Sequence, residues 1–148
     1  MPAFSRKIPG PVHLRHYPDY HLVAWQPRGV LNDRKLDQIA DWLFEIEKTS
    51  LPFIRYIDFS RLTTVAVRTR HVFKISERRL REYIGTTPIR TALFCNLWVG
   101  FGIALLYERL MKGTPIEARA FRDHTAAAAW LSVPADILTL ADKPAPHV

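Results

Sequence analysis

A short apolar segment at residues 52–60 constrains the fold more than any other feature of this sequence. It reads PFIRYIDFS, so aromatic and β-branched residues predominate before a polar turn formed by Asp58 and Ser60. Segments of this kind are typical of central strands, and along this chain they alternate with helical patterns. The sequence therefore predicts an α/β domain with a mixed sheet, a parallel core, an N-terminal antiparallel hairpin and about four helices on its faces. In such sheets ligands bind beyond the carboxyl ends of the strands, so we expect function at residues 58–70.

The length of the chain fits a single domain, because 148 residues with 48% hydrophobic content suffice for a substantial core. We expect an extended lead-in at residues 1–11, the domain at residues 12–133 and a poorly ordered tail at residues 134–148. The first ten residues lack the apolar run of a secretory signal, which predicts a cytoplasmic protein. The single cysteine, Cys95, lies among apolar residues, as a buried and inert thiol would.

Local patterns predict the order of the elements. Residues 12–17 and 20–26 read as a hairpin whose turn contains Pro18 and Asp19, and residues 61–67 follow the central strand as a loop. Further strands are expected at residues 91–97 and 116–121. Helices are expected from Asn32 or Asp33 to about residue 48, and at about residues 69–84, 98–112 and 124–131. The apolar run at residues 92–107 is shorter than the roughly 20 residues that span a bilayer, which argues against a transmembrane segment.

The positive charge is concentrated in one part of the chain. Nine basic and three acidic residues lie between Arg55 and Arg90, so this segment carries most of the formal charge of +7. On the second predicted helix, four basic residues share one side of the helical wheel, opposite Val72, Phe73 and Leu80. We call this set the basic stripe: Arg70, Lys74, Arg78 and Arg81.

Three interpretations of the basic stripe remain open. It is a solvated face, a docking site for an acidic protein, or a contact with anionic lipid headgroups. Nucleic acid is a weaker candidate, because the stripe lacks the interleaved aromatic residues on which bases stack.

Two segments carry a resemblance to a known family. They are residues 56–60, YIDFS, and the closing residues 118–131, ARAFRDHTAAAAWL. Together with the element order, which is matched over residues 20–133, they resemble the SpoIIAA-like family, relatives of the STAS domains found in anti-sigma-factor antagonists and anion-transporter tails. The resemblance implies the fold predicted above and leaves the function open, because most of the family has no known role.

The same resemblance suggests two regulatory or binding activities. STAS proteins of the sporulation type carry an Asp-Ser-Ser/Thr-Gly turn whose serine is phosphorylated, but residues 61–69 here read RLTTVAVRT. This departure argues against a phosphorylation switch, although Thr63 or Thr64 would be the hydroxyls available for one. The family is also similar to CRAL-TRIO lipid-transfer domains, which implies an apolar ligand as an alternative.

Signals for metal binding and catalysis are weak. The histidines, at positions 13, 16, 21, 71, 124 and 147, are not spaced as metal ligands, and no Gly-x-Ser-x-Gly nucleophile elbow is present. Asp58 and Ser60 fit a turn that bonds its own amides better than a catalytic pair. Gly100 and Gly102 open a helix as a phosphate cradle would, but close packing of that helix on the sheet explains them better. We therefore expect no metal and no cofactor, and an enzyme is the weakest of three hypotheses.

The sequence is best interpreted as a non-catalytic regulatory or binding module. We expect a protein partner or a small anionic ligand at the loops after the central strands. The predicted binding residues are Asp58, Ser60, Arg61, Thr63, Thr64, Arg68, Arg70, Trp98, Gly100, Phe101 and Gly102. The alternative is a peripheral binder of lipid or of an apolar ligand, using the basic stripe with Trp98 and Phe101. The surplus of aromatic residues also predicts a homodimer.

Overall fold

The computed structural model describes residues 12–49, 54–83 and 88–139. Within these residues the strands are β1 (Val12–Tyr17), β2 (Leu22–Pro27), β3 (Gly29–Asn32), β4 (Ile54–Asp58), β5 (Leu62–Ala66), β6 (Ile89–Phe94) and β7 (Ile116–Phe121). The helices are α1 (Asp33–Thr49), α2 (Thr69–Glu82), α3 (Trp98–Leu110) and α4 (His124–Leu131), with short 3-10 turns η2 (Pro18–Tyr20) and η3 (Ala135–Leu138).

The main sheet has five strands in the order β1-β2-β4-β6-β7. β1 and β2 form the predicted antiparallel hairpin, and every other neighbouring pair is parallel. β4 is the central strand, with Ile57 opposite Trp25 on one side and Leu93 on the other. The predicted mixed sheet with a parallel core is confirmed.

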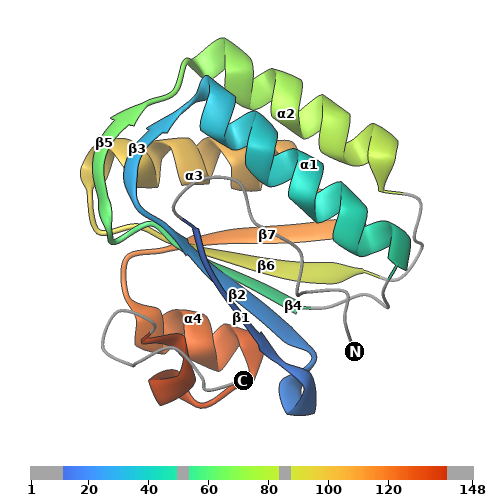
Figure 1. Ribbon diagram of the computed structural model, residues 1–148, viewed down its shortest axis with the longest axis vertical. Helices are drawn as coiled ribbons and strands as arrows, with labels where there is room; N and C mark the ends of the chain where they lie inside the picture. The colour runs from blue at the N-terminus through green and yellow to red at the C-terminus, as the bar shows by residue number, and fades with distance from the viewer. Residues whose placement is uncertain (1–11, 50–53, 84–87, 140–148) are drawn as a thin grey trace.

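The two faces of the main sheet carry different numbers of helices. α1, α2 and α3 cover one face and α4 covers the other (Figure 1). Side chains alternate along a strand, so Ile57 in β4 and Phe59 just after it lie in the core beneath the three helices, and Tyr56 lies in the core beneath α4. We call these the three-helix side and the α4 side.

A second, two-stranded sheet was not expected from the sequence. β3 and β5 pair in parallel, with Leu31 opposite Val65. The residues of β3 were expected to lead directly from the hairpin into a helix, and those of β5 were expected to be a loop. Their pairing spans more than 30 residues and buries Leu31 and Leu62. This contact is not visible in the local pattern of either segment.

The buried face of α2 differs from the predicted apolar face. Val72 and Ser76 are buried as expected, but Phe73 and Leu80 are 46% and 38% exposed. Arg79 is buried in their place. The prediction for Phe73 and Leu80 was wrong because α2 packs against both α1 and α3, so its buried side is set by two neighbouring helices and not by the sheet alone.

The domain extends beyond its predicted end at residue 133. Ala135–Leu138 form η3, and Leu138 is fully buried among the residues that α4 packs against. These residues were expected to begin the poorly ordered tail, and their structure corrects that boundary. The rest of the predicted tail, residues 140–148, and the predicted lead-in lie outside the described residues. Within the described ranges, no helix is both long enough and apolar enough to cross a bilayer.

Candidate binding site at the carboxyl edge of the sheet

The carboxyl ends of β4, β6 and β7 meet at one edge of the main sheet, which we call the carboxyl edge. Backbone hydrogen bonds continue past the strands and hold the three following loops together. Phe59 N–H donates to the Phe94 carbonyl oxygen (2.8 Å), and Cys95 N–H donates to the Phe121 carbonyl oxygen (3.0 Å). Residues distant in sequence are therefore presented at this edge on a rigid base.

Asp58 is buried at the end of β4 and accepts two hydrogen bonds. Its Oδ1 accepts from Ser60 N–H (2.8 Å), and its Oδ2 accepts from Gln26 Nε2 (2.9 Å). Arg28 Nη2 in turn donates to Gln26 Oε1 (2.9 Å). A buried carboxylate needs such donors, so Asp58 has a structural function in shaping the loop. Sequence reasoning anticipated the bond to Ser60 but missed Gln26 and Arg28. Gln26 lies in the neighbouring strand β2, 32 residues before Asp58 in the sequence, and Arg28 follows that strand.

A pocket of about 130 Å³ opens beside Asp58 on the α4 side. Its lining residues come from β4 and the loop after it, from β6, from α4 and from the end of η3 with the residue that follows: Tyr56, Asp58, Ser60, Arg61, Phe94, His124, Leu138 and Thr139. Tyr56 is fully buried, and its hydroxyl makes no hydrogen bond within the described part of the chain. Burial raises the pKa of Tyr56 above its usual value, and the nearby charges of Asp58 and Asp123 raise it further. The hydroxyl therefore stays protonated at neutral pH.

The first turn of α3 packs tightly against the loop after β6. A Cβ built on Gly100 would overlap Cys95 Sγ, whereas a Cβ on Gly102 would meet no atom within 4 Å. Cys95 is fully buried, and its thiol donates to the Leu97 carbonyl oxygen (3.4 Å). Burial raises the pKa of the Cys95 thiol, although the bond to Leu97 and the charge of Arg122 oppose this. Close packing thus accounts for Gly100, and Cys95 remains a neutral thiol.

An exposed apolar surface forms where α3 begins. Trp98 and Val99 are 73% and 65% exposed, and Leu97 is exposed beside them. The guanidinium of Arg122, from the loop after β7, lies 3.7 Å from the Trp98 ring centroid and 5.6 Å from that of Phe101. We call these five residues the Trp98 surface. Sequence reasoning identified Trp98 and Phe101 but assigned Arg122 only to the start of the last helix.

The remaining predicted binding residues lie on other elements. Thr63 and Thr64 are exposed on β5, and Arg70 is exposed on the first turn of α2. Arg68 precedes α2 and binds Asp33 at the start of α1, with its Nε 2.6 Å from Asp33 Oδ2. The predicted set therefore divides into three groups, of which two, those of β4 and α3, lie at the carboxyl edge.

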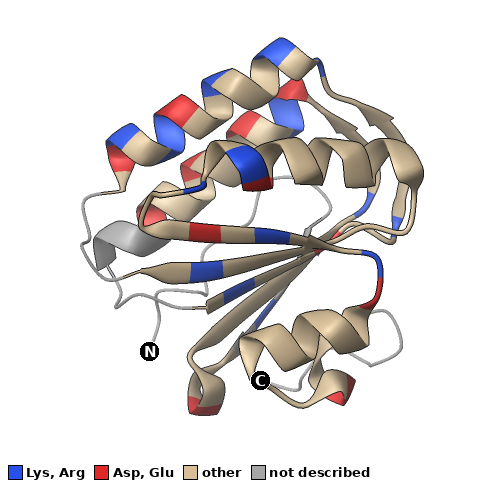
Figure 2. Cartoon of the chain, turned by 180° about the vertical axis from the view of Figure 1, so that it is seen from behind, with Lys and Arg blue, Asp and Glu red and all other residues tan. Residues whose placement is uncertain are grey.

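The basic stripe lies beside acidic residues. Arg78 is ion-paired with Asp41 on α1 and with Glu82 on its own helix. His71, two turns earlier, has its Nε2 2.8 Å from Asp37 Oδ1. Figure 2 shows that acidic and basic positions interleave along α2. These pairs reduce the field of the stripe, and Arg78 joins two helices instead of extending a cationic surface.

Within the described ranges, no three His, Cys, Asp or Glu side chains are grouped so that they could hold a metal ion. The arrangement at the carboxyl edge instead combines exposed aromatic and aliphatic groups, arginines and one small polar pocket. These are the components of a binding surface.

Comparison with known proteins supports the fold. No protein-family model matches the chain, and no curated protein sequence matches it. Among solved structures, it is similar to an uncharacterized protein of the DUF3478 family from Shewanella loihica PV-4, which is described as having a SpoIIAA-like fold. The match has 18% sequence identity and a TM-score of 0.51, and it covers 81% of this chain and 91% of that one. The resemblance found in the sequence is thus confirmed at the level of the fold: this chain adopts a SpoIIAA-like fold.

Proposed function

We propose that this domain is a non-catalytic binding module and that its Trp98 surface docks an acidic segment of a protein partner. The observation that carries the proposal is the exposure of Trp98 at the carboxyl edge, with the Arg122 guanidinium stacked on its ring. Tryptophan and arginine are the residue types most enriched among energetically dominant interface residues.

The charge around this surface indicates the chemistry of the partner. Arg61 and Arg122 are both exposed at the carboxyl edge. A partner segment with an apolar side chain would bury Trp98 and Val99, and carboxylates beside it would pair with the two arginines. Acidic segments that contain an aliphatic or aromatic anchor therefore fit best.

The state of the polar residues nearby supports binding over catalysis. Both Asp58 oxygens already accept hydrogen bonds from Gln26 and Ser60, so this carboxylate is engaged in holding the loop. The Cys95 thiol is buried, and its pKa is raised, which disfavours the thiolate that nucleophilic catalysis needs.

The proposal is tested by selecting peptides from a random display library on the immobilised protein. We expect the selected peptides to be enriched in Asp and Glu beside an apolar residue. Trp98→Ala and Arg122→Glu should each weaken their binding at least about tenfold, as is typical of dominant interface residues. Phe73→Ala is the matched control, because Phe73 is a half-exposed aromatic residue on α2. Peptides without acidic enrichment, or binding that survives Trp98→Ala, would overturn the proposal.

Two other occupants of the Trp98 surface give distinct results. If sedimentation shows a dimer that Trp98→Ala dissociates, the surface binds a second copy of this chain and the acidic-partner proposal fails. If the protein sediments with anionic vesicles and Trp98→Ala abolishes this, the surface binds a membrane. The variant Arg70→Glu/Lys74→Glu then reports whether the basic stripe contributes.

A further inference from the structure

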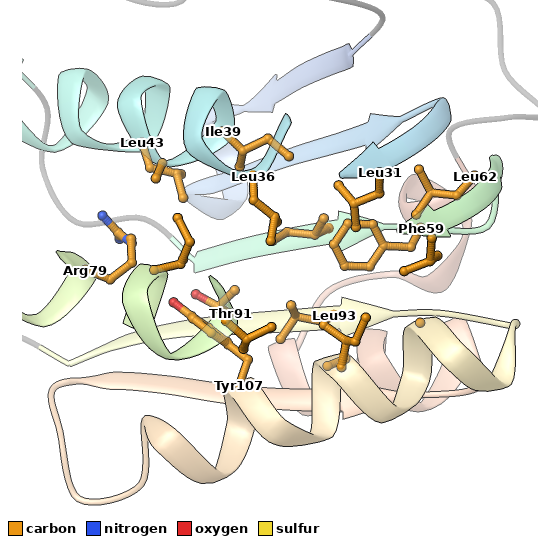
Figure 3. Close-up of a pocket in the computed structure, with 18 of the residues that line it drawn as sticks. Leu31, Leu36, Ile39, Leu43, Phe59, Leu62, Arg79, Thr91, Leu93 and Tyr107 are labelled. Atoms are coloured by element: carbon orange, nitrogen blue, oxygen red, sulfur yellow. The ribbon is translucent and has the colours of Figure 1, made fainter. Parts of the chain in front are cut away.

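Two hollows lie on opposite sides of the main sheet, and they differ in what lines them. The cavity on the three-helix side has a volume of about 80 Å³ and an almost wholly apolar lining (Figure 3). Leu36, Ile39 and Leu93 are among the side chains that Figure 3 shows along it. The pocket beside Asp58 on the α4 side is larger, at about 130 Å³, and most of its lining residues are polar. We call it the Asp58 pocket, and its polar lining makes it the better candidate for a selective site.

The hydroxyl of Tyr56 is the feature of this pocket that points to a ligand. Tyr56 is 0% exposed, and its hydroxyl has no hydrogen-bond partner among the described residues. Burial raises the pKa of Tyr56, and the charges of Asp58 and Asp123 raise it further, so the hydroxyl stays protonated at neutral pH. Buried hydroxyls in native proteins are normally satisfied, because an unmade hydrogen bond is costly. The Tyr56 hydroxyl therefore needs an acceptor.

Asp58 sets a second requirement. Its carboxylate lines the same pocket, and its two oxygens each accept one hydrogen bond, from Ser60 N–H and from Gln26 Nε2. A carboxylate has about four lone-pair sites, so Asp58 can accept a further bond from a ligand donor. Its charge disfavours an anion, while an ammonium group offers no acceptor to Tyr56. Arg61 also lines the pocket, but it is exposed and its charge is screened by solvent. A neutral ligand with an acceptor beside a donor meets both requirements.

The apolar part of the lining fits a small flat ring. Phe94, which is paired with Asp58 between β6 and β4, makes an edge contact with the ring of His124 at the start of α4. The two ring centroids are 6.1 Å apart, and the rings are inclined at 78°. Leu138 of η3 adds a fully buried aliphatic side chain. An apolar cavity of about 150 Å³ accepts benzene. A pocket of about 130 Å³ therefore suits a ligand of one six-membered ring or less.

We infer that the Asp58 pocket binds a small neutral amide, whose carbonyl oxygen accepts from the Tyr56 hydroxyl and whose N–H donates to the Asp58 carboxylate. A lactam ring holds these two groups side by side and places its apolar edge against Phe94 and Leu138. The inference does not rest on the proposed function. The pocket lies on the α4 side of the carboxyl edge, and Arg61 is the residue that it shares with the charges assigned to the acidic partner.

The first experiment titrates the ¹⁵N-labelled full chain with two matched pairs of small molecules, followed by chemical shifts. In the first pair, 2-pyridone carries the lactam N–H, and 2-pyranone replaces it with a ring oxygen of nearly the same size. In the second pair, isobutyramide and isobutyrate have nearly the same shape and differ in charge. We expect the lactam and the amide each to bind about tenfold or more tightly than its partner in the pair. The shifts should concentrate at residues 56–61, 94 and 124.

The variant Tyr56→Phe tests the hydroxyl directly. It removes the unpartnered group and keeps the ring, so it should weaken 2-pyridone about tenfold or more. The free energy of unfolding of the ligand-free protein should not fall, because no hydrogen bond is lost. A purely structural role for Tyr56 gives the reverse result, lower stability with unchanged binding. Tyr20→Phe is the matched control, since Tyr20 is 41% exposed and does not line the pocket, and it should change neither quantity.

Each outcome decides the inference. Equal affinity within either pair, or unchanged binding of 2-pyridone by Tyr56→Phe, would refute the amide site. If the folded protein binds none of the four molecules at millimolar concentration, water alone satisfies Tyr56 and the inference is overturned. Trp98→Ala should retain 2-pyridone binding, and Tyr56→Phe should retain binding of the selected acidic peptides. Failure of the proposed partner surface and failure of this inference are therefore distinguishable.

Discussion

At the scale of single residues, Gly100 sets how closely α3 approaches the sheet. It is buried at the start of α3, where any side chain would overlap Cys95 Sγ, while Gly102 two residues later faces open space. The two glycines look equivalent in the sequence, but only Gly100 is required by a close contact. The same contact holds Trp98 and the loop after β6 in place at the carboxyl edge.

We expect Gly100→Ala to destabilise the fold by about 1–3 kcal/mol, because the added methyl forces the helix or the cysteine to shift. Gly102→Ala is the control and should be neutral or stabilising by up to about 1 kcal/mol, because alanine favours a helix. Chemical denaturation measures the free energy of unfolding of both variants. Cys95→Ala should partly rescue Gly100→Ala, and a Gly100→Ala variant as stable as the wild type would contradict the close contact.

At the scale of elements, the short β3–β5 sheet brings together the beginnings of α1 and α2. β3 leads into α1 and β5 leads toward α2, so Asp33 and Arg68 meet although they are 35 residues apart. Arg68 N–H donates to Asp33 Oδ1 (3.0 Å), and Arg68 Nε binds Oδ2 of the same carboxylate. Further along, His71 and Arg78 pair with Asp37 and Asp41. The two helices are thus joined by a row of polar pairs on their outer side.

The hydrogen bond from the Arg68 backbone N–H lowers the pKa of Asp33. Burial has a smaller, opposing effect, and the Arg68 side chain and the charge of His71 lower the pKa further. A lowered pKa means that folding favours the ionised carboxylate. The contribution of Asp33 should therefore be complete above its ordinary pKa of about 4 and be lost as the pH falls through the lower folded value. We expect the denaturation midpoints of wild type and Asp33→Asn to differ at neutral pH and to converge in acid. A difference between the two denaturation midpoints that stays constant down to the lowest pH measured would contradict this prediction.

The orientation of α2 gives another test at this scale. Val72→Ala should cost about 2 kcal/mol, because it removes two buried methyl groups and leaves a cavity. Phe73→Ala should cost less than about 0.5 kcal/mol, because Phe73 is half-exposed. Chemical denaturation of the two variants distinguishes the observed orientation from the predicted one. If Phe73→Ala lowered the free energy of unfolding more than Val72→Ala, the result would support the orientation predicted from the sequence.

At the scale of the whole molecule, the two sides of the sheet have different roles. The α4 side is held by small alanines and carries the buried Gln26–Asp58 pair that shapes the carboxyl edge. The three-helix side contains the cavity, bounded by helices whose outer contacts are mostly polar. The exposed Trp98 surface and the internal cavity are therefore separate features of the domain.

An empty cavity of this size lowers stability. At about 24 cal/mol per Å³, a cavity of 80 Å³ costs about 2 kcal/mol. Ala104→Val, which fills part of it, should raise the free energy of unfolding by about 0.5–1 kcal/mol. Ala129→Val on the exposed side of α4 is the control and should lower it by about 0.5 kcal/mol, because valine is a poorer helix former. Destabilisation of both variants would indicate that no space is available beside Ala104.

The local sequence determined the type and order of most elements. The central strand, the hairpin, the four helices and the Asp58–Ser60 turn follow from periodicity and capping, which depend on residues within a few positions of one another. The β3–β5 pairing, the buried face of α2 and the structured residues 135–138 depend on contacts between distant segments, so no local pattern indicated them. The same holds for the sites. Asp58 and Trp98 were visible in the sequence, but the Gln26 contact, the Arg122 stacking and the internal cavity exist only because the fold brings separate elements together.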